Sequence, residues 1–177
     1  METRIEVFLQ KGINDREGEA IKNDIQDLGI KKVKRVKTAQ IYLIEGKISQ
    51  SQTRTICQDL LIDPLIQEYQ TTKSLRAIAK QSHEIATSSA LKSGLLAMTS
   101  KFNPWIVEVW FKKGVTDTVA ESAAKGIRDM GIKGVKNVRT GKKHLLFGSL
   151  SPKEVEIICQ RLLANSIIQN YSVKKNE

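Results

Sequence analysis

Residues 11–30 read KGINDREGEAIKNDIQDLGI, and residues 113–132 read KGVTDTVAESAAKGIRDMGI. The two stretches carry Lys-Gly, Asp, Glu, Ile, Asp and Gly-Ile at the same places, 102 residues apart. With that offset, residues 5–71 align with residues 107–173 without a gap, and 26 of the 67 pairs are identical. The chain therefore consists of two copies of one module, copy one at residues 1–71 and copy two at 104–177, joined by a connector at 72–103.

The first half of each copy predicts a strand followed by a helix. Apolar residues alternate with other residues from Ile5 to Leu9 and again from Val107 to Phe111, as in a half-buried strand. Asp15 and Asp117 then stand where a carboxylate can cap a helix. The buried stripe of that helix in copy one is predicted at Ile21, Ile25 and Leu28. Gly29 and Gly131 are placed to end the helix with positive φ.

The second half of each copy predicts two extended segments, a second helix and a last strand. In copy one the extended segments contain Ile30 to Val36 and Ile41 to Ile44. Ser49 with Gln52, and Ser151 with Glu154, form capping boxes at the next helix. A short strand is predicted from Leu65 to Tyr69. Each copy then reads β-α-β-β-α-β, an α+β two-layer sandwich with both helices on one face of the sheet.

Pairing of the two copies is expected on physical grounds. A module of about 70 residues buries a modest fraction of its surface and is marginally stable alone. A two-layer sheet also leaves edge strands that need covering. Both problems are solved if the copies pack as an intramolecular pseudo-dimer. For the connector, we expect either partial helix or an extended strap, since a long structureless loop inside a compact unit is unusual.

Composition is that of a soluble globular protein. Of the 177 residues, 40% are hydrophobic and 27% charged, and no apolar stretch is long enough to span a bilayer. Met1 leads directly into a charged, strand-like segment without an apolar signal region, so a cytoplasmic location is expected. Cys57 and Cys159 occupy equivalent places in apolar helical patterns and are predicted to be buried thiols.

Enzyme signatures are scarce in the sequence. His83 lies in the connector, and His144 lies in a predicted strand where copy one has Tyr42, so we expect His144 to be a half-exposed strand residue. No metal-ligand spacing, glycine-rich phosphate loop or nucleophile elbow is present. The sequence predicts no catalytic residue, no cofactor and no metal.

The net charge of +10 is unevenly distributed along the chain. Copy one is neutral, with 11 basic and 11 acidic residues, whereas residues 72–103 contribute +4 and residues 104–177 contribute +6. Basic residues cluster around the second extended segment of each copy, at Lys31, Lys32, Lys34, Arg35 and Lys37 and at Lys133, Lys136, Arg139, Lys142 and Lys143. These clusters are either a solvated sheet edge or a patch for an acidic partner surface or phosphate group, with Arg139 the best bidentate donor. Nucleic acid is less favoured because interleaved aromatic residues are missing.

With the module laid out, the chain resembles the PurS family, the small subunit of phosphoribosylformylglycinamidine synthase. The resemblance is carried by order and spacing over both copies, and is clearest at Lys113–Asp117, Gly131-Ile132, Val135–Lys142 and Cys159–Tyr171. It implies a non-catalytic structural subunit of an ATP- and glutamine-dependent enzyme of purine biosynthesis. In that family a dimer of the small subunit bridges the glutaminase (PurQ) and synthetase (PurL) subunits for ammonia transfer.

The family's Val-Arg-x-Gly-Lys stretch is retained in copy two, whereas copy one reads Val36-Lys37-Thr38-Ala39-Gln40. We therefore expect a partner contact at Arg139, Gly141 and Lys142, and a paired chain that can self-associate further. Two other functions stay open at this point. One is a ferredoxin-like regulatory module that binds a small anionic ligand between the copies. The other is a basic nucleic-acid-binding module.

Overall fold

The computed structural model describes residues 1–73 and 103–175. His83 and most of the expected connector lie outside these described residues. The elements of copy one are β1 (Glu2–Leu9), α1 (Arg16–Asp27), β2 (Val33–Gly46), α2 (Gln50–Ile56), a π-helical turn η1 (Cys57–Leu61) and β3 (Gln67–Lys73). Copy two repeats them as β4 (Trp105–Phe111), α4 (Thr118–Asp129), β5 (Val135–Gly148), α5 (Pro152–Ile158), η3 (Cys159–Leu163) and β6 (Gln169–Lys175).

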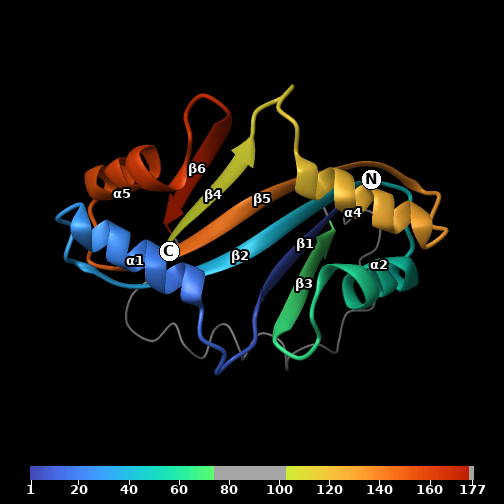
Figure 1. The fold of residues 1–177 in the computed structure, drawn as a ribbon, viewed down its shortest axis with the longest axis horizontal. Helices are drawn as coiled ribbons and strands as arrows, with labels where there is room; N and C mark the ends of the chain where they lie inside the picture. Colours follow the sequence, from blue (N-terminus) through green and yellow to red (C-terminus); the bar gives the residue numbers. More distant parts are fainter. Residues whose placement is uncertain (74–102, 176–177) are drawn as a thin grey trace, which may run out of the picture.

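The six strands form one antiparallel sheet in the order β3-β1-β2-β5-β4-β6 (Figure 1). The two copies meet at the centre, where β2 and β5 pair along their whole length, from Val33 opposite Gly148 to Gly46 opposite Val135. This confirms the α+β class and the pairing of the two β-α-β-β-α-β copies within one chain. Continuous pairing across β2 and β5 makes the two copies a single sheet.

The two extended segments expected after the first helix are in fact one strand of 14 residues in each copy. The sequence suggests two segments because the middle of the strand, Lys37 to Gln40, contains no large apolar residue. The structure gives the reason: Val33 and Val36 belong to one hydrophobic core, whereas Ile44 belongs to the other. The polar middle of the strand lies between two cores, where no apolar side chain is required.

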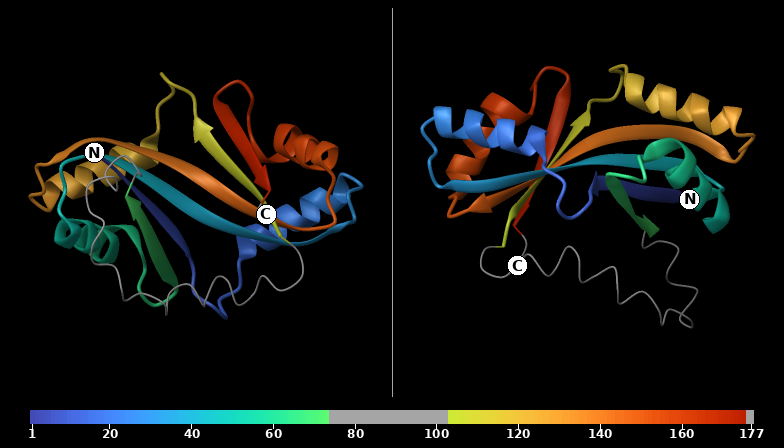
Figure 2. Two further views of the ribbon diagram at one scale, coloured as in Figure 1. Left: turned by 180° about the vertical axis from the view of Figure 1, so that it is seen from behind. Right: turned by 60° about the horizontal axis from the view of Figure 1, so that its bottom comes forward.

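Both cores are built from both copies. The first helix of each copy lies beside the second helix of the other copy, α1 beside α5 and α4 beside α2, and packs into a core that contains strands of that other copy (Figure 2). In one core, Ile25 of α1 packs with Val107, Leu146 and Ile158 of copy two. In the other, Ile127 of α4 takes the equivalent place among residues of copy one. Because side chains alternate along β2, Val36 and Ile44 point to the same face, so the helices cover one face of the sheet.

The predicted helix ends are confirmed. Asp15 and Asp117 cap α1 and α4, and Ser49 and Ser151 begin α2 and α5 with complete capping boxes. Gly29 and Gly131 end the first helices with φ of 87° and 76°. These signals could be identified because a cap depends on neighbours within a few residues.

Two local predictions are wrong. Leu28, placed in the buried stripe of α1, is 40% exposed because it stands at the C-cap, beyond the last helical turn that faces the core. The last strand of copy one begins at Gln67 rather than Leu65. Asp63 accepts hydrogen bonds from the backbone N–H groups of Leu65 and Gln67, which holds residues 63–66 in a turn.

Candidate partner-binding site

An aspartate–threonine pair in each copy fixes the start of the first helix against the long strand. Asp117 accepts hydrogen bonds from the N–H of Ala120 at 2.9 Å, the N–H of Thr140 at 2.8 Å and the hydroxyl of Thr140. Asp15 does the same with Gly18 and Thr38. The aspartates were predicted from the sequence as helix caps, whereas the threonines were not. The signal was present, because Thr follows Asp by 23 residues in both copies.

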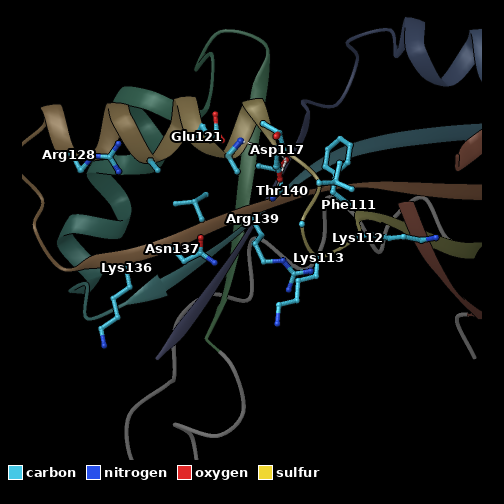
Figure 3. A pocket seen from close by; sticks show the side chains of 16 residues that line it. Phe111, Lys112, Lys113, Asp117, Glu121, Arg128, Lys136, Asn137, Arg139 and Thr140 are labelled. Carbon is cyan, nitrogen blue, oxygen red and sulfur yellow. Dashed lines mark hydrogen bonds between the residues drawn. The ribbon is translucent and has the colours of Figure 1, made fainter. Parts of the chain in front are cut away.

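This pair closes one end of a pocket of about 600 Å³ in copy two, called here the copy-two pocket. Its lining includes the apolar residues Ala120, Ala124 and Val138. Its walls are the turn after β4, helix α4 and strand β5 (Figure 3). Basic side chains come from all three walls, at Lys112, Lys113, Arg128, Lys136 and Arg139. The acidic lining is smaller, because Asp117 is already engaged by the helix start and Thr140, which leaves Glu121.

Arg139 is held over an aromatic ring at the edge of this pocket. Its guanidinium carbon lies 5.6 Å from the centre of the Trp110 ring, within the range of a cation–π contact. The ring lies against the backbone of Gly141, where a Cβ atom would come within 2.7 Å of a ring carbon. Arg139 and Gly141 thus lie together on the face of the sheet without helices. The Trp110 ring contacts both, the guanidinium of Arg139 and the backbone of Gly141.

Lys142 lies on the opposite face of the sheet from Arg139 and Gly141, as alternation along a strand requires. Its ammonium group pairs with Glu17 at the start of α1, so it joins copy two to copy one. The three residues expected to form one contact therefore do not share one surface. In the structure, Gly141 makes room for Trp110 and Lys142 makes a contact between the copies.

A second set of ion pairs joins the copies on the face without helices. Arg4 of copy one contacts Glu6 at 2.6 Å and Glu108 of copy two at 2.7 Å, and Lys143 of copy two contacts Glu6 at 2.7 Å. Burial alone would raise the pKa of Glu6, but the hydrogen bonds and positive charges of Lys143 and Arg4 hold that pKa below its usual value. Lys142 and Lys143 of the predicted basic cluster in copy two are consequently engaged within the chain, as is Lys32 of copy one, which pairs with Glu154.

The equivalent cavity of copy one, called the copy-one pocket, has a volume of about 500 Å³ and a different charge. Lys37 stands where copy two has Arg139. The pKa of Lys37 is lowered, mainly by burial and to a smaller extent by repulsion from Arg35. Glu6, Asp15 and Glu19 line the same pocket. Acidic and basic groups are therefore nearly balanced in copy one, whereas the copy-two pocket has a clear positive excess.

His144 is not the half-exposed residue that its strand position suggested. It is 3% exposed, lies opposite Thr38 at the junction of β2 and β5, and its Nδ1 has no hydrogen-bond partner among the described residues. Burial lowers the pKa of His144 to about 4. The strand pattern was misleading because residue 144 faces the helix side of the sheet, where side chains of both copies enclose it.

Cys57 and Cys159 are fully buried free thiols, as predicted, and burial raises the pKa of each to about 12. Both thiols are therefore protonated at neutral pH. Within residues 1–73 and 103–175, no group of three or more His, Cys, Asp or Glu side chains is arranged to hold a metal ion. None of the helices in the described part of the chain has the length and apolar character needed to cross a membrane.

Comparison with known proteins places both copies in one family. The family model described as PurS, phosphoribosylformylglycinamidine (FGAM) synthase, matches twice, at residues 2–74 and 105–177. The chain is also 37% identical, over 68 residues, to phosphoribosylformylglycinamidine synthase subunit PurS of Archaeoglobus fulgidus. That alignment covers 36% of this chain and 85% of the relative, so one copy corresponds to nearly a whole relative. The double match and the paired fold together show that the chain belongs to the PurS family, with two family modules in tandem.

Proposed function

We propose that this chain is a non-catalytic structural subunit of FGAM synthase in purine biosynthesis. In this role it bridges a PurL-like synthetase subunit and a PurQ-like glutaminase subunit, so that ammonia passes between their active sites. The observation that carries the proposal is the double family match on two copies that share their cores. One chain then supplies the two modules that a bridging dimer requires, and it needs no cofactor of its own.

The two shared cores make the molecule rigid, which suits a protein that bridges two others. A bridge must hold two large proteins in a fixed relation, and a well-packed core resists deformation. Here β2 and β5 run through the whole molecule, and each first helix is anchored on the other copy. The two ends of the molecule are therefore held in a fixed relation by one sheet.

We further propose Arg139 as a partner contact. It is exposed, it has no carboxylate partner among the described residues, and Trp110 fixes its position. A guanidinium in a fixed place can form a bidentate contact with a carboxylate of another protein. Gly141 contributes to this site because its missing Cβ leaves room for the Trp110 ring.

Co-purification tests the bridging role. The tagged chain is mixed with the synthetase and glutaminase subunits of the same organism, with and without ATP and glutamine, and the mass of the complex is measured in solution. Retention of both subunits, and no complex between them when this chain is omitted, supports the proposal. Failure to retain either subunit under any of these conditions contradicts it.

A further inference from the structure

Each copy presents an aliphatic side chain at the tip of the turn before its last strand. Leu65 is 82% exposed and its equivalent Ile167 is 81% exposed. A single exposed aliphatic residue on a protein surface needs no explanation. These two, however, occupy the same place in both copies, and the turns that carry them are built in the same way.

The turns are held by matching hydrogen bonds. In copy two, Asn165 accepts from the N–H of Ile167 at 2.9 Å and from the N–H of Gln169 at 2.7 Å, while the Gln169 side chain accepts from the N–H of Asn165 at 2.9 Å. Asp63, Leu65 and Gln67 repeat these contacts in copy one. An apolar side chain on a fixed turn loses little conformational freedom on binding, which favours its use as an anchor.

In copy two this anchor is continuous with the basic pocket. The N–H of Lys112 donates to the carbonyl of Ile168 at 2.9 Å, and the Lys112 ammonium donates to the carbonyl of Ser166. Lys112 also lines the copy-two pocket. The pocket and the turn thus form one surface, the copy-two docking surface, around the part of β5 that β4 does not pair with. Its exposed groups are Ile167, Lys113, Arg128, Lys136 and Arg139.

The corresponding surface of copy one has the same anchor but a smaller excess of positive charge. Lys11 and Lys37 stand where copy two has Lys113 and Arg139, but the copy-one pocket is also lined by Glu6, Asp15 and Glu19. Gln10 replaces Lys112 and donates its side-chain N–H to the carbonyls of Pro64 and Gln67. Gln26 stands where copy two has Arg128. The apolar anchor is therefore common to both ends of the molecule, whereas the larger excess of positive charge belongs to copy two.

We propose that the copy-two docking surface binds a partner protein. The partner's surface would offer an apolar socket for Ile167, and acidic side chains would border that socket. This inference rests on the proposed function and specifies the chemistry of one of its two contacts. A protein is favoured over a small anion because the basic groups are exposed around an open rim, next to an apolar anchor. Interfaces combine a few buried anchors with a polar border in this way.

Matched substitutions at the two ends test the proposal. Affinities of the full chain for the synthetase and the glutaminase subunits are measured separately, at low and at raised NaCl concentration. The variants are Ile167→Asp and Arg139→Glu in copy two, with Leu65→Asp and Lys37→Glu at the equivalent places in copy one. Circular dichroism melting checks that each variant is folded.

We expect Ile167→Asp and Arg139→Glu to weaken binding to the same subunit, each by about tenfold or more. Arg139→Glu also reduces the salt dependence of that binding, while Leu65→Asp and Lys37→Glu leave this subunit's affinity within about twofold. The proposal is overturned if the two copy-two variants affect different subunits, or if the copy-one variants weaken the same contact equally. It is also overturned if inorganic phosphate binds the pocket and Arg139→Glu abolishes only that binding. If the unaltered chain binds neither the synthetase nor the glutaminase subunit, the bridging role itself is refuted.

Discussion

Copy one and copy two have the same backbone but use equivalent positions differently. Asp15 and Asp117 make the same three hydrogen bonds, because both copies need their first helix fixed to the long strand. On the strand itself, Lys37, Ala39 and Gln40 of copy one correspond to Arg139, Gly141 and Lys142 of copy two. Positions that hold the fold together are repeated, and positions that face outward or toward the other copy differ.

This comparison shows what joining two modules in one chain permits. In a pair of identical chains, a substitution enters both halves of the interface at once. Here Arg4 and Lys143 each appear once and neutralise Glu6 and Glu108 across the junction. Their equivalents in the other copy are Ile106 and Ile41. The tandem chain can therefore place a charge in one copy and an apolar residue at the equivalent position of the other.

The largest effects are expected in the cores, where the two copies should behave alike. Ile25 and Ile127 are fully buried, and each lies in the core that contains the other copy's sheet. Truncation to Ala, in Ile25→Ala or Ile127→Ala, is expected to lower the free energy of unfolding by about 2–5 kcal/mol. Leu28→Ala, at a 40% exposed position of the same helix, serves as the control and should cost much less.

Calorimetry of these variants also tests whether the copies are separable. Because each core contains residues of both copies, the chain should unfold in one cooperative transition that both substitutions shift as a whole. Two transitions, of which Ile25→Ala moves only one, would show that the copies fold independently.

The second expected effect is a pH dependence of stability caused by His144. Copy one has Tyr42 at the equivalent position, which does not titrate in this pH range. The pKa of His144 is lowered from 6.5 to about 4 in the folded chain, mainly by burial. Between these two values the unfolded chain binds more protons than the folded chain, so stability is complete above pH 6.5 and falls as the pH decreases toward 4. At about 1.4 kcal/mol per pKa unit, the loss approaches about 3 kcal/mol.

Urea unfolding near neutral pH and again at about pH 4.5 measures this loss, and His144→Tyr should remove it. Comparison with the variant is necessary because carboxylates titrate in the same range. An equal decrease in stability for His144→Tyr and the unaltered chain would show that the imidazole does not cause the effect.

The difference between local and long-range information explains what the sequence could predict. Asp15, Gly29 and Ser49 were identified as helix ends because capping involves neighbouring residues. The stripe containing Ile25 indicated a buried helix face but not which sheet would cover it. Only pairing of β2 with β5 decides that α1 packs on copy two. The separation of Lys142 from Arg139 was predictable, since alternate residues of a strand face opposite sides.

A smaller effect is expected at Gly141, whose equivalent in copy one is Ala39. A Cβ at residue 141 would lie 2.7 Å from the Trp110 ring and 2.9 Å from the carbonyl of Val109. The variant Gly141→Ala should therefore displace the ring and cost about 1–3 kcal/mol, as in overpacked sites. The reverse change, Ala39→Gly, should cost about 0.5–1 kcal/mol through backbone entropy alone.

Tryptophan fluorescence and urea unfolding distinguish these two causes. Displacement of the ring changes the emission of Trp110 in Gly141→Ala but not in Ala39→Gly. An unchanged emission together with unchanged stability would mean that the strand accommodates the added methyl group, and Gly141 would no longer account for the position of Arg139.

The smallest effect is expected at Lys142, where copy one has Gln40. The Lys142 ammonium pairs with Glu17, and the two side chains are 53% and 48% exposed, so water screens the pair. Such pairs contribute about 0–1 kcal/mol, and Lys142→Gln should change the free energy of unfolding by no more than that. Because Lys142 faces away from Arg139, the substitution should also leave the affinity for either synthase subunit unchanged, whereas Arg139→Glu should not. If Lys142→Gln instead weakened binding as strongly as Arg139→Glu while the chain stayed folded, the partner contact would have to extend around the sheet to α1. The assignment of Lys142 to the contact between copies and of Arg139 to the partner contact would then be wrong.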